Sequence, residues 1–319
     1  MLARTADNMY WLARYMERAD FVARIVDATL RLEALPKTYG GSETEWESTL
    51  TAAGAWDSFK EAYGSLTPAN AIEFLTFDKR NPSSIRNCIE CARTNARAVR
   101  TALTIETWEC INSGWLELKR FEATHDQKGG FDRDTLARFL EFAKKMSLDA
   151  DGSAYRTMLR DDAYWFSRLG LYVERADNTA RILDVKYHVL LPETETVGGS
   201  LDYFQWTAIL RAVSALTAYH WVYRDSVNPR NIADLLILKP EMPRSLISCY
   251  ENIGRFVDSI SRAYGRQGPS QRRARQVLTR LENLKIDEIQ SGGLHEFITD
   301  FLDDNNRLGA DIAEQYLLN

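Results

Sequence analysis

The stretch YMERADFVARIVD, residues 15–27, combines helical spacing with more charge than a buried helix usually carries. Its apolar residues Val22, Ile25 and Val26 recur at helical intervals and predict a face turned toward a core. The same stretch nevertheless carries five charged side chains within eleven residues: Glu17, Arg18, Asp20, Arg24 and Asp27. A second stretch, YVERADNTARILD at residues 172–184, has the same residue at nine of the thirteen positions. The fold must therefore accommodate this charge pattern twice.

A helical projection at about 100° per residue separates the charges into stripes and edges. One stripe carries Glu17, Asp20, Arg24 and Asp27, and the matching stripe carries Glu174, Asp177, Arg181 and Asp184. Arg18 and Arg175 fall outside the stripes, at the edge of each apolar face. A desolvated arginine requires a carboxylate partner. We therefore expect each helix to meet the other, or a neighbouring helix, so that the arginine of one crosses to an acid of the other.

The duplication extends beyond the two charged segments. NPSSIRNCIE at 81–90 aligns with MPRSLISCYE at 242–251, and Trp46 aligns with Trp206. Apolar residues recur at helical spacing almost throughout, and no long stretch alternates with period two. These patterns predict an all-α fold, a multi-helix bundle built from two sequence-related helical repeats packed about a pseudo-two-fold axis. We expect one domain over 1–319, with the first repeat at about 1–150 and the second at about 151–319.

The breaks between apolar patterns set the expected helix boundaries. Longer helices are expected at 3–34, 43–64, 82–111, 132–147, 154–190, 200–221, 243–265, 270–285 and 293–317. Shorter helices are expected at 68–76, 113–124 and 229–237.

Composition argues against several partners. The net charge is −5 and the isoelectric point about 5.6, which argues against broad nucleic-acid binding because that function needs a basic face. No apolar run approaches the roughly 18 residues of a membrane span, and the charged N-terminal stretch lacks the apolar region of a signal peptide. The sequence therefore predicts a cytoplasmic protein without a membrane or nucleic-acid partner.

The charged segments leave three interpretations open. They form a buried ion-pair network that fixes the two repeats, a polar pocket for a ligand, or the acid/base or metal site of an enzyme. The catalytic candidates are Glu17, Arg18, Asp20, Glu174, Arg175 and Asp177. The ligand-binding candidates are Arg24, Asp27, Arg181 and Asp184, joined by Arg93 and Arg97 of the basic stretch at 91–100.

No motif points to a metal or a cofactor. The four histidines are scattered, and the histidine partners common in di-iron bundle sites are missing beside the acids. The chain also lacks a Gly-rich phosphate loop and a nucleophile motif. We therefore expect no metal site and no cofactor.

The quoted segments, with the Tyr10-Trp11 pair and NPSSIRNCIECARTNARAVR at 81–100, resemble the bacterial alpha-E family over essentially the whole chain. That family is helical, has a Glu-Arg motif and has no established chemistry. The resemblance implies a bacterial accessory or peptide-binding protein of a peptide- or amide-forming modification system. The partners it implies are a circularly permuted ATP-grasp protein and a transglutaminase-like protein. A peptide ligand and a homo-oligomer stay open, as does a purely structural scaffold.

Overall fold

The structure, a computed structural model, describes residues 3–34, 42–188 and 200–317, and its regular elements in these ranges are all helical. The expected all-α class is therefore confirmed. The helices, in chain order, are α1 (Ala3–Glu33), α2 (Ser42–Ala52), α3 (Trp56–Tyr63), α4 (Pro68–Thr76), α5 (Ile85–Ala98), α6 (Ile105–Lys128), α7 (Arg133–Thr157), α8 (Asp162–His188), α9 (Ser200–Ala212), α10 (Leu216–Tyr223), α11 (Pro229–Leu238), α12 (Leu246–Tyr264), α13 (Pro269–Asn283), α14 (Ile286–Gly292) and α15 (Leu294–Tyr316). A 3₁₀ turn at Arg100–Ala102 separates α5 from α6.

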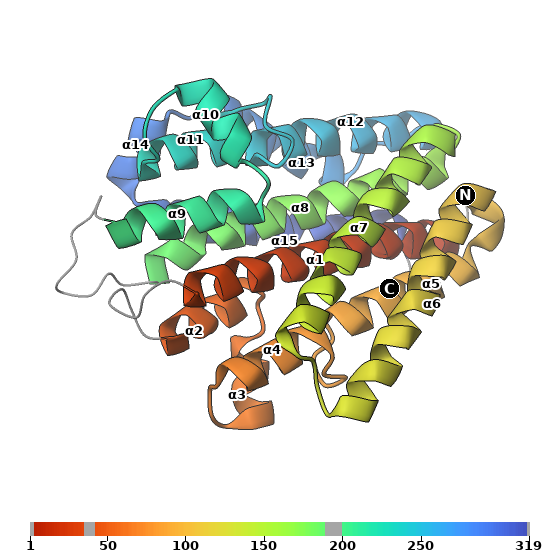
Figure 1. The fold of residues 1–319 in the computed structure, drawn as a ribbon. Coiled ribbons are helices and arrows are strands. Elements are labelled where there is room, and N and C mark those ends of the chain that lie inside the picture. The colour runs from red at the N-terminus through yellow and green to blue at the C-terminus, as the bar shows by residue number, and fades with distance from the viewer. Residues whose placement is uncertain (1–2, 35–41, 189–199, 318–319) are drawn as a thin grey trace.

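The two charged segments lie on the two helices at the centre of the bundle, α1 and α8, which run side by side in Figure 1. α1 has 31 residues and buries side chains on nearly all of its sides, which is the pattern of a helix enclosed by others. The two helices come very close at Gly170 of α8. A Cβ atom there would stand 2.2 Å from the carbonyl oxygen of Tyr10 on α1, so only glycine permits this approach.

The remaining helices surround this central pair. α5 and α7 pack on α1, while α12 and α15 pack on α8. Two helices pack on the central helix of the other half of the chain: α2 packs on α8, and α9 packs on α1. In Figure 1, α12 and α13 lie on one side of the pair, and α3 and α4 lie on the opposite side. The charged segments are thereby enclosed by helices from both halves of the chain.

Similar N-terminal caps begin corresponding helices in the two halves. Ser84 and Ser245 each cap a helix by accepting a hydrogen bond from a backbone N–H three residues on, at the start of α5 and α12. Thr67 and Asn228 cap α4 and α11 in the same way, each with proline as the next residue.

Two expected helices are interrupted. The stretches 43–64 and 200–221 were each predicted as one helix, but α2 and α3 are separate, as are α9 and α10. The chain turns through left-handed backbone at Gly54, with φ of 64°, and at Ser214, with φ of 57°. Glycine marks such a bend, whereas serine rarely adopts positive φ, so the second break left no clear signal in the sequence.

Two further boundaries also differ. The predicted helix at 82–111 ends earlier, at Ala98, and α6 begins at Ile105, where Thr104 accepts a hydrogen bond from the Thr107 N–H. α7 extends to Thr157, past the predicted end, so that α8 begins only at Asp162. Capping by a threonine whose partner lies three residues on is a local event that apolar periodicity does not detect.

Candidate functional site

Two reciprocal ion pairs join α1 to α8. Arg18 donates from Nε to Glu174 Oε1 at 2.6 Å and from Nη2 to Glu174 Oε2 at 3.1 Å. Arg175 donates from Nε and Nη2 to the two oxygens of Glu17, both at 2.9 Å. Each arginine thus presents two parallel N–H groups to one carboxylate, which is the geometry of a strong charge-assisted pair. The expected crossing of each arginine to an acid of the other helix is confirmed.

A further arginine binds each of these glutamates. Arg14 of α1 donates to Glu174 Oε2 at 2.7 Å. Arg244, just before α12, donates to Glu17 Oε1 at 2.6 Å and to Asp20 Oδ2 at 2.8 Å. Neither arginine was among the candidates predicted from the sequence. The signal for Arg14 was its place one helical turn before Arg18, and for Arg244 it was an arginine in the aligned segment where the first copy has Ser83.

The two aspartates are held by their own helices. Arg24 Nε lies 2.7 Å from Asp20 Oδ2, and Arg181 Nε lies 2.6 Å from Asp177 Oδ2, both at i, i+4 spacing. These arginines also reach the bends between the shorter helices. Arg24 Nη1 donates to Ser214 Oγ at 2.7 Å, and Arg181 Nη1 would lie 3.3 Å from a Cβ atom added at Gly54.

Burial and the neighbouring arginines shift the pKa values of the two glutamates in opposite directions. Both are only 2% exposed, and burial by itself raises the pKa of a carboxyl group. Arg175 and Arg244 outweigh that effect at Glu17 and lower its pKa to about 2. Arg14 and Arg18 lower the pKa of Glu174 to about 2 as well. Both carboxylates are therefore ionised at neutral pH.

This arrangement leaves little room for chemistry at the glutamates. All four of their carboxylate oxygens accept hydrogen bonds from arginine. A general acid or base works best with a pKa near the operating pH, and a metal ligand needs a free lone pair. Within the described ranges, no group of three or more His, Cys, Asp or Glu side chains is placed to hold a metal ion. Asp20 Oδ1 is buried and has no hydrogen-bond partner among the described residues, but the other oxygen of this carboxylate already binds Arg24 and Arg244.

The other ligand-binding candidates lie outside this cluster. Asp184 contacts Nδ1 of His295 on α15 at 2.6 Å. Arg93 lies over the ring of Trp115 on α6, with its guanidinium carbon 4.2 Å from the centroid, while Arg97 is exposed on the outer side of α5. The structure therefore does not bring Arg93 and Arg97 to the Glu-Arg cluster, and it uses Arg93 in packing.

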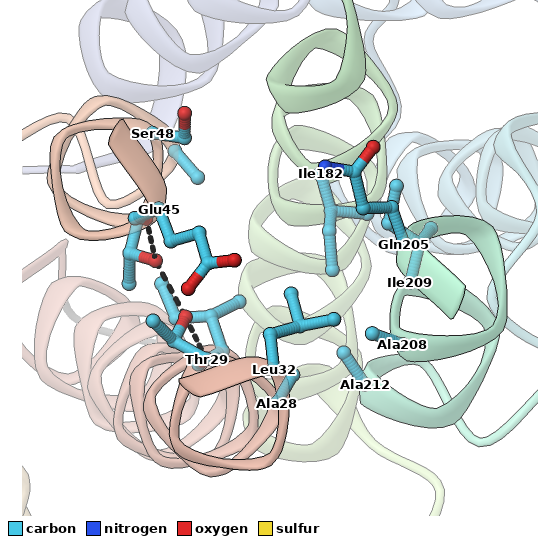
Figure 2. A pocket seen from close by; sticks show the side chains of 13 residues that line it. Ala28, Thr29, Leu32, Glu45, Ser48, Ile182, Gln205, Ala208, Ile209 and Ala212 are labelled. Atoms are coloured by element: carbon cyan, nitrogen blue, oxygen red, sulfur yellow. Dashed lines mark hydrogen bonds between the residues drawn. The ribbon is translucent and has the colours of Figure 1, made fainter. Parts of the chain in front are cut away.

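An apolar cavity lies beyond the cluster, between α1, α2, α8 and α9 (Figure 2). Its walls include Leu32, Ile182 and Ile209. The carboxyl group of Glu45 points into it (Figure 2), without an ion-pair partner among the described residues. Burial, together with the nearby Glu33, raises the pKa of Glu45 to about 7. The cavity therefore contains a carboxyl group that keeps its proton to a higher pH than an exposed glutamate does.

A second hollow, here called the basic groove, opens between α1, α7 and α9. Its charged lining residues are Arg24, Asp27, Arg31, Lys144 and Arg211. Asp27 Oδ2 contacts both Arg31 Nη2 and Lys144 Nζ at 3.3 Å. The candidates Arg24 and Asp27 thus come together in this groove, whereas Arg181 and Asp184 do not line it.

The fold and the cluster define a class: an all-helical protein whose two central helices exchange Glu-Arg ion pairs. The chain belongs to the Alpha-E family, described as a predicted alpha-helical domain with a conserved ER motif, which it matches over residues 1–317. The two central Glu-Arg pairs of the structure fall within the matched range.

Similar proteins occur in mycobacteria. An uncharacterized protein of Mycobacterium bovis and another of Mycobacterium tuberculosis are each 21% identical to this chain, over 94% of its length and 35% of their own. The chain therefore spans about a third of the length of these relatives. No solved structure gives a significant match. Among the described helices, none is long and apolar enough to cross a membrane.

Proposed function

We propose that this chain is a non-catalytic helical accessory protein that binds peptide in a bacterial peptide- or amide-forming modification system. Its partners would be a circularly permuted ATP-grasp protein and a transglutaminase-like protein, as the alpha-E resemblance implies, and its place would be the cytoplasm. The observation that carries the non-catalytic part is the complete pairing of Glu17 and Glu174 with arginines. These carboxylates are ionised and buried, and arginine N–H groups bind their oxygens, which is consistent with a structural role.

The same proposal explains why the motif occurs twice. Two helical repeats, at about 1–150 and 151–319, would pack about a pseudo-two-fold axis, with the Glu-Arg pairs fixing their relative orientation. The support is the reciprocity of Arg18–Glu174 and Arg175–Glu17, together with the matching caps at Ser84 and Ser245. A buried ionic pair that sets the register between helices is the best attested use of such groups.

The two copies would differ in where the additional cation comes from. Glu174 receives it from Arg14, whose aligned position in the second copy is Leu171. Glu17 receives it from Arg244, whose aligned position in the first copy is Ser83. Each glutamate would thus keep two arginines although the repeats have diverged.

The relatives support a role beside other components. They carry the region similar to this chain as about a third of a longer polypeptide. A helical region that forms one part of a longer polypeptide is suited to binding or positioning other components. The basic groove offers a surface for such binding.

Co-purification tests the proposal. The chain is co-expressed with the ATP-grasp protein and the transglutaminase-like protein of the same organism, and nucleotide-dependent amide formation is measured with and without it. We expect a stable complex and a lower rate of amide formation when the chain is omitted. If neither a complex nor a change of rate is found, the accessory role is wrong.

A pure scaffold is the second candidate, favoured by the pairing of both buried glutamates with arginines. It would form the complex but bind no peptide.

A further inference from the structure

We infer that the basic groove binds an acidic, extended peptide segment that also carries aromatic or aliphatic side chains. This inference rests on the proposed binding function and specifies the chemistry of the ligand.

Positive charge exceeds negative charge in the groove. Four cationic side chains line it (Arg24, Arg31, Lys144 and Arg211), against one lining carboxylate, Asp27. Two further carboxylates pair with the lining cations from beside the groove, Asp20 with Arg24 and Glu141 with Lys144. The excess is therefore carried by Arg31 and Arg211, in a chain whose net charge is −5. A concave site with an excess of one charge attracts ligands of the opposite sign and raises their association rate.

Two arginines of the groove have hydrogen-bonding capacity left over. Arg211 is exposed and makes no ion pair with any described residue. Arg31 contacts Asp27 at 3.3 Å, and its side chain is 59% exposed. Lys144, by contrast, is held by Asp27 at 3.3 Å and by Glu141 at 2.9 Å. Guanidinium groups with free N–H donors suit carboxylates that arrive from solution.

Part of the groove lining is apolar. Tyr203 and Phe204, on the first turns of α9, are 42% and 39% exposed, with ring centroids 5.8 Å apart. Leu32 of α1 and Ala208 of α9 line the groove beside them. Exposed aromatic rings next to arginines are the residues that dominate binding energy in protein–peptide contacts.

The position of Asp27 favours a peptide over a nucleotide. Asp27 stands among the cations and would repel a compact triphosphate, whereas the carboxylates of an extended peptide can be spaced so as to avoid it.

Fluorescence anisotropy with the purified full chain tests the inference. The probe is a fluorescein-labelled peptide of glutamates interrupted by two phenylalanines, and the comparison peptide replaces each glutamate with lysine. We expect the acidic peptide to bind at least about tenfold more tightly, with an affinity that falls as salt is added. Excess unlabelled acidic peptide should displace the probe, and ATP should not.

Two charge reversals provide a matched pair of variants. Arg211→Glu should weaken binding of the acidic peptide by about tenfold or more, since a charge-assisted hydrogen bond is replaced by repulsion. Arg307→Glu changes the net charge equally at another exposed arginine that lacks an ion pair among the described residues, and it should leave the affinity unchanged.

Three results would overturn the inference: equal affinity for the two peptides, equal weakening by the two variants, or displacement of the probe by ATP. None of these involves the ATP-grasp partner. Failure of the peptide inference is therefore distinct from failure of the accessory role, which appears only in the co-purification and rate measurements.

Discussion

Arg18 on α1 binds both carboxylate oxygens of Glu174 on α8, 156 positions further along the chain. Because Arg175 returns the same contact to Glu17, the two central helices cannot slide or rotate against each other without breaking two buried ion pairs. Breaking a buried pair costs far more than the pair contributes relative to an apolar replacement. The cluster therefore contributes more to the relative orientation of α1 and α8 than to the stability of the fold.

Glu17→Gln should destabilise the protein. The change leaves the buried Arg175 without its carboxylate, and we expect a loss of about 3 kcal/mol in the free energy of unfolding, measured by denaturant titration. Glu141→Gln on α7, where the side chain is 71% exposed, should change it by less than about 0.5 kcal/mol. A stable Glu17→Gln protein that has lost an activity would instead favour a catalytic site.

Glu17→Gln combined with Arg175→Met should cost less than the sum of the two single changes. The double variant removes both buried charges, and Arg244 keeps Asp20 as its partner at 2.8 Å. We expect a coupling of about 2 kcal/mol in a double-mutant cycle followed by thermal unfolding. Simple additivity would mean that the two side chains do not stabilise one another.

Stability should fall in acid because of the two glutamates. Their folded-state pKa of about 2 lies below the ordinary value of 4.5, so the unfolded chain binds more protons between these values. The contribution is fully present above pH 4.5 and is lost as the pH falls through about 2. Denaturant titrations across this range should show a steep decline for the natural chain and a shallower one for Glu174→Gln. Parallel declines would contradict the assignment.

Glu45→Gln should act in the opposite direction. The pKa of Glu45 is raised to about 7, so its contribution is fully present below pH 4.5 and is lost as the pH rises through 7. We expect the variant to be more stable at pH 8, on the order of 1 kcal/mol or roughly 2 °C in Tm, and equal to the natural chain at pH 4. Glu47→Gln, at an exposed position of the same helix, serves as the control. A difference that does not vary with pH would refute the explanation.

Gly170→Ala should separate the central helices. The new Cβ would stand 2.2 Å from the Tyr10 carbonyl oxygen, and backbone atoms cannot give way as a flexible side chain can. We expect a loss of about 3 kcal/mol, read as a drop in Tm. Gly152→Ala on α7 meets no atom within 4 Å and should stabilise the protein by about 0.5–1 kcal/mol. Equal effects of the two substitutions would show that α1 and α8 are not in close contact at Gly170.

Several features of the fold and the site could be predicted from the sequence because they depend on neighbours along the chain. Apolar periodicity indicated the helical class, and the displaced position of Arg18 indicated that it crosses to an acid elsewhere. The bend at Ser214 could not be predicted, because nothing local favours positive φ at a serine. Arg244 was missed because its distance from Glu17 depends on how α12 packs against α8.

The sequence by itself determined an all-helical chain with a charge pattern that occurs twice and needs partners inside the protein. Only the tertiary structure decided which partners those are: Arg18 with Glu174, Arg175 with Glu17, and Arg244 with both Glu17 and Asp20. It also decided that Arg24 and Asp27 line a groove with Arg211 of α9. The physical reason is the separation along the chain of the residues that take part. Helical periodicity repeats every few residues and can be read locally, whereas ion pairs and grooves form between side chains that only packing brings together.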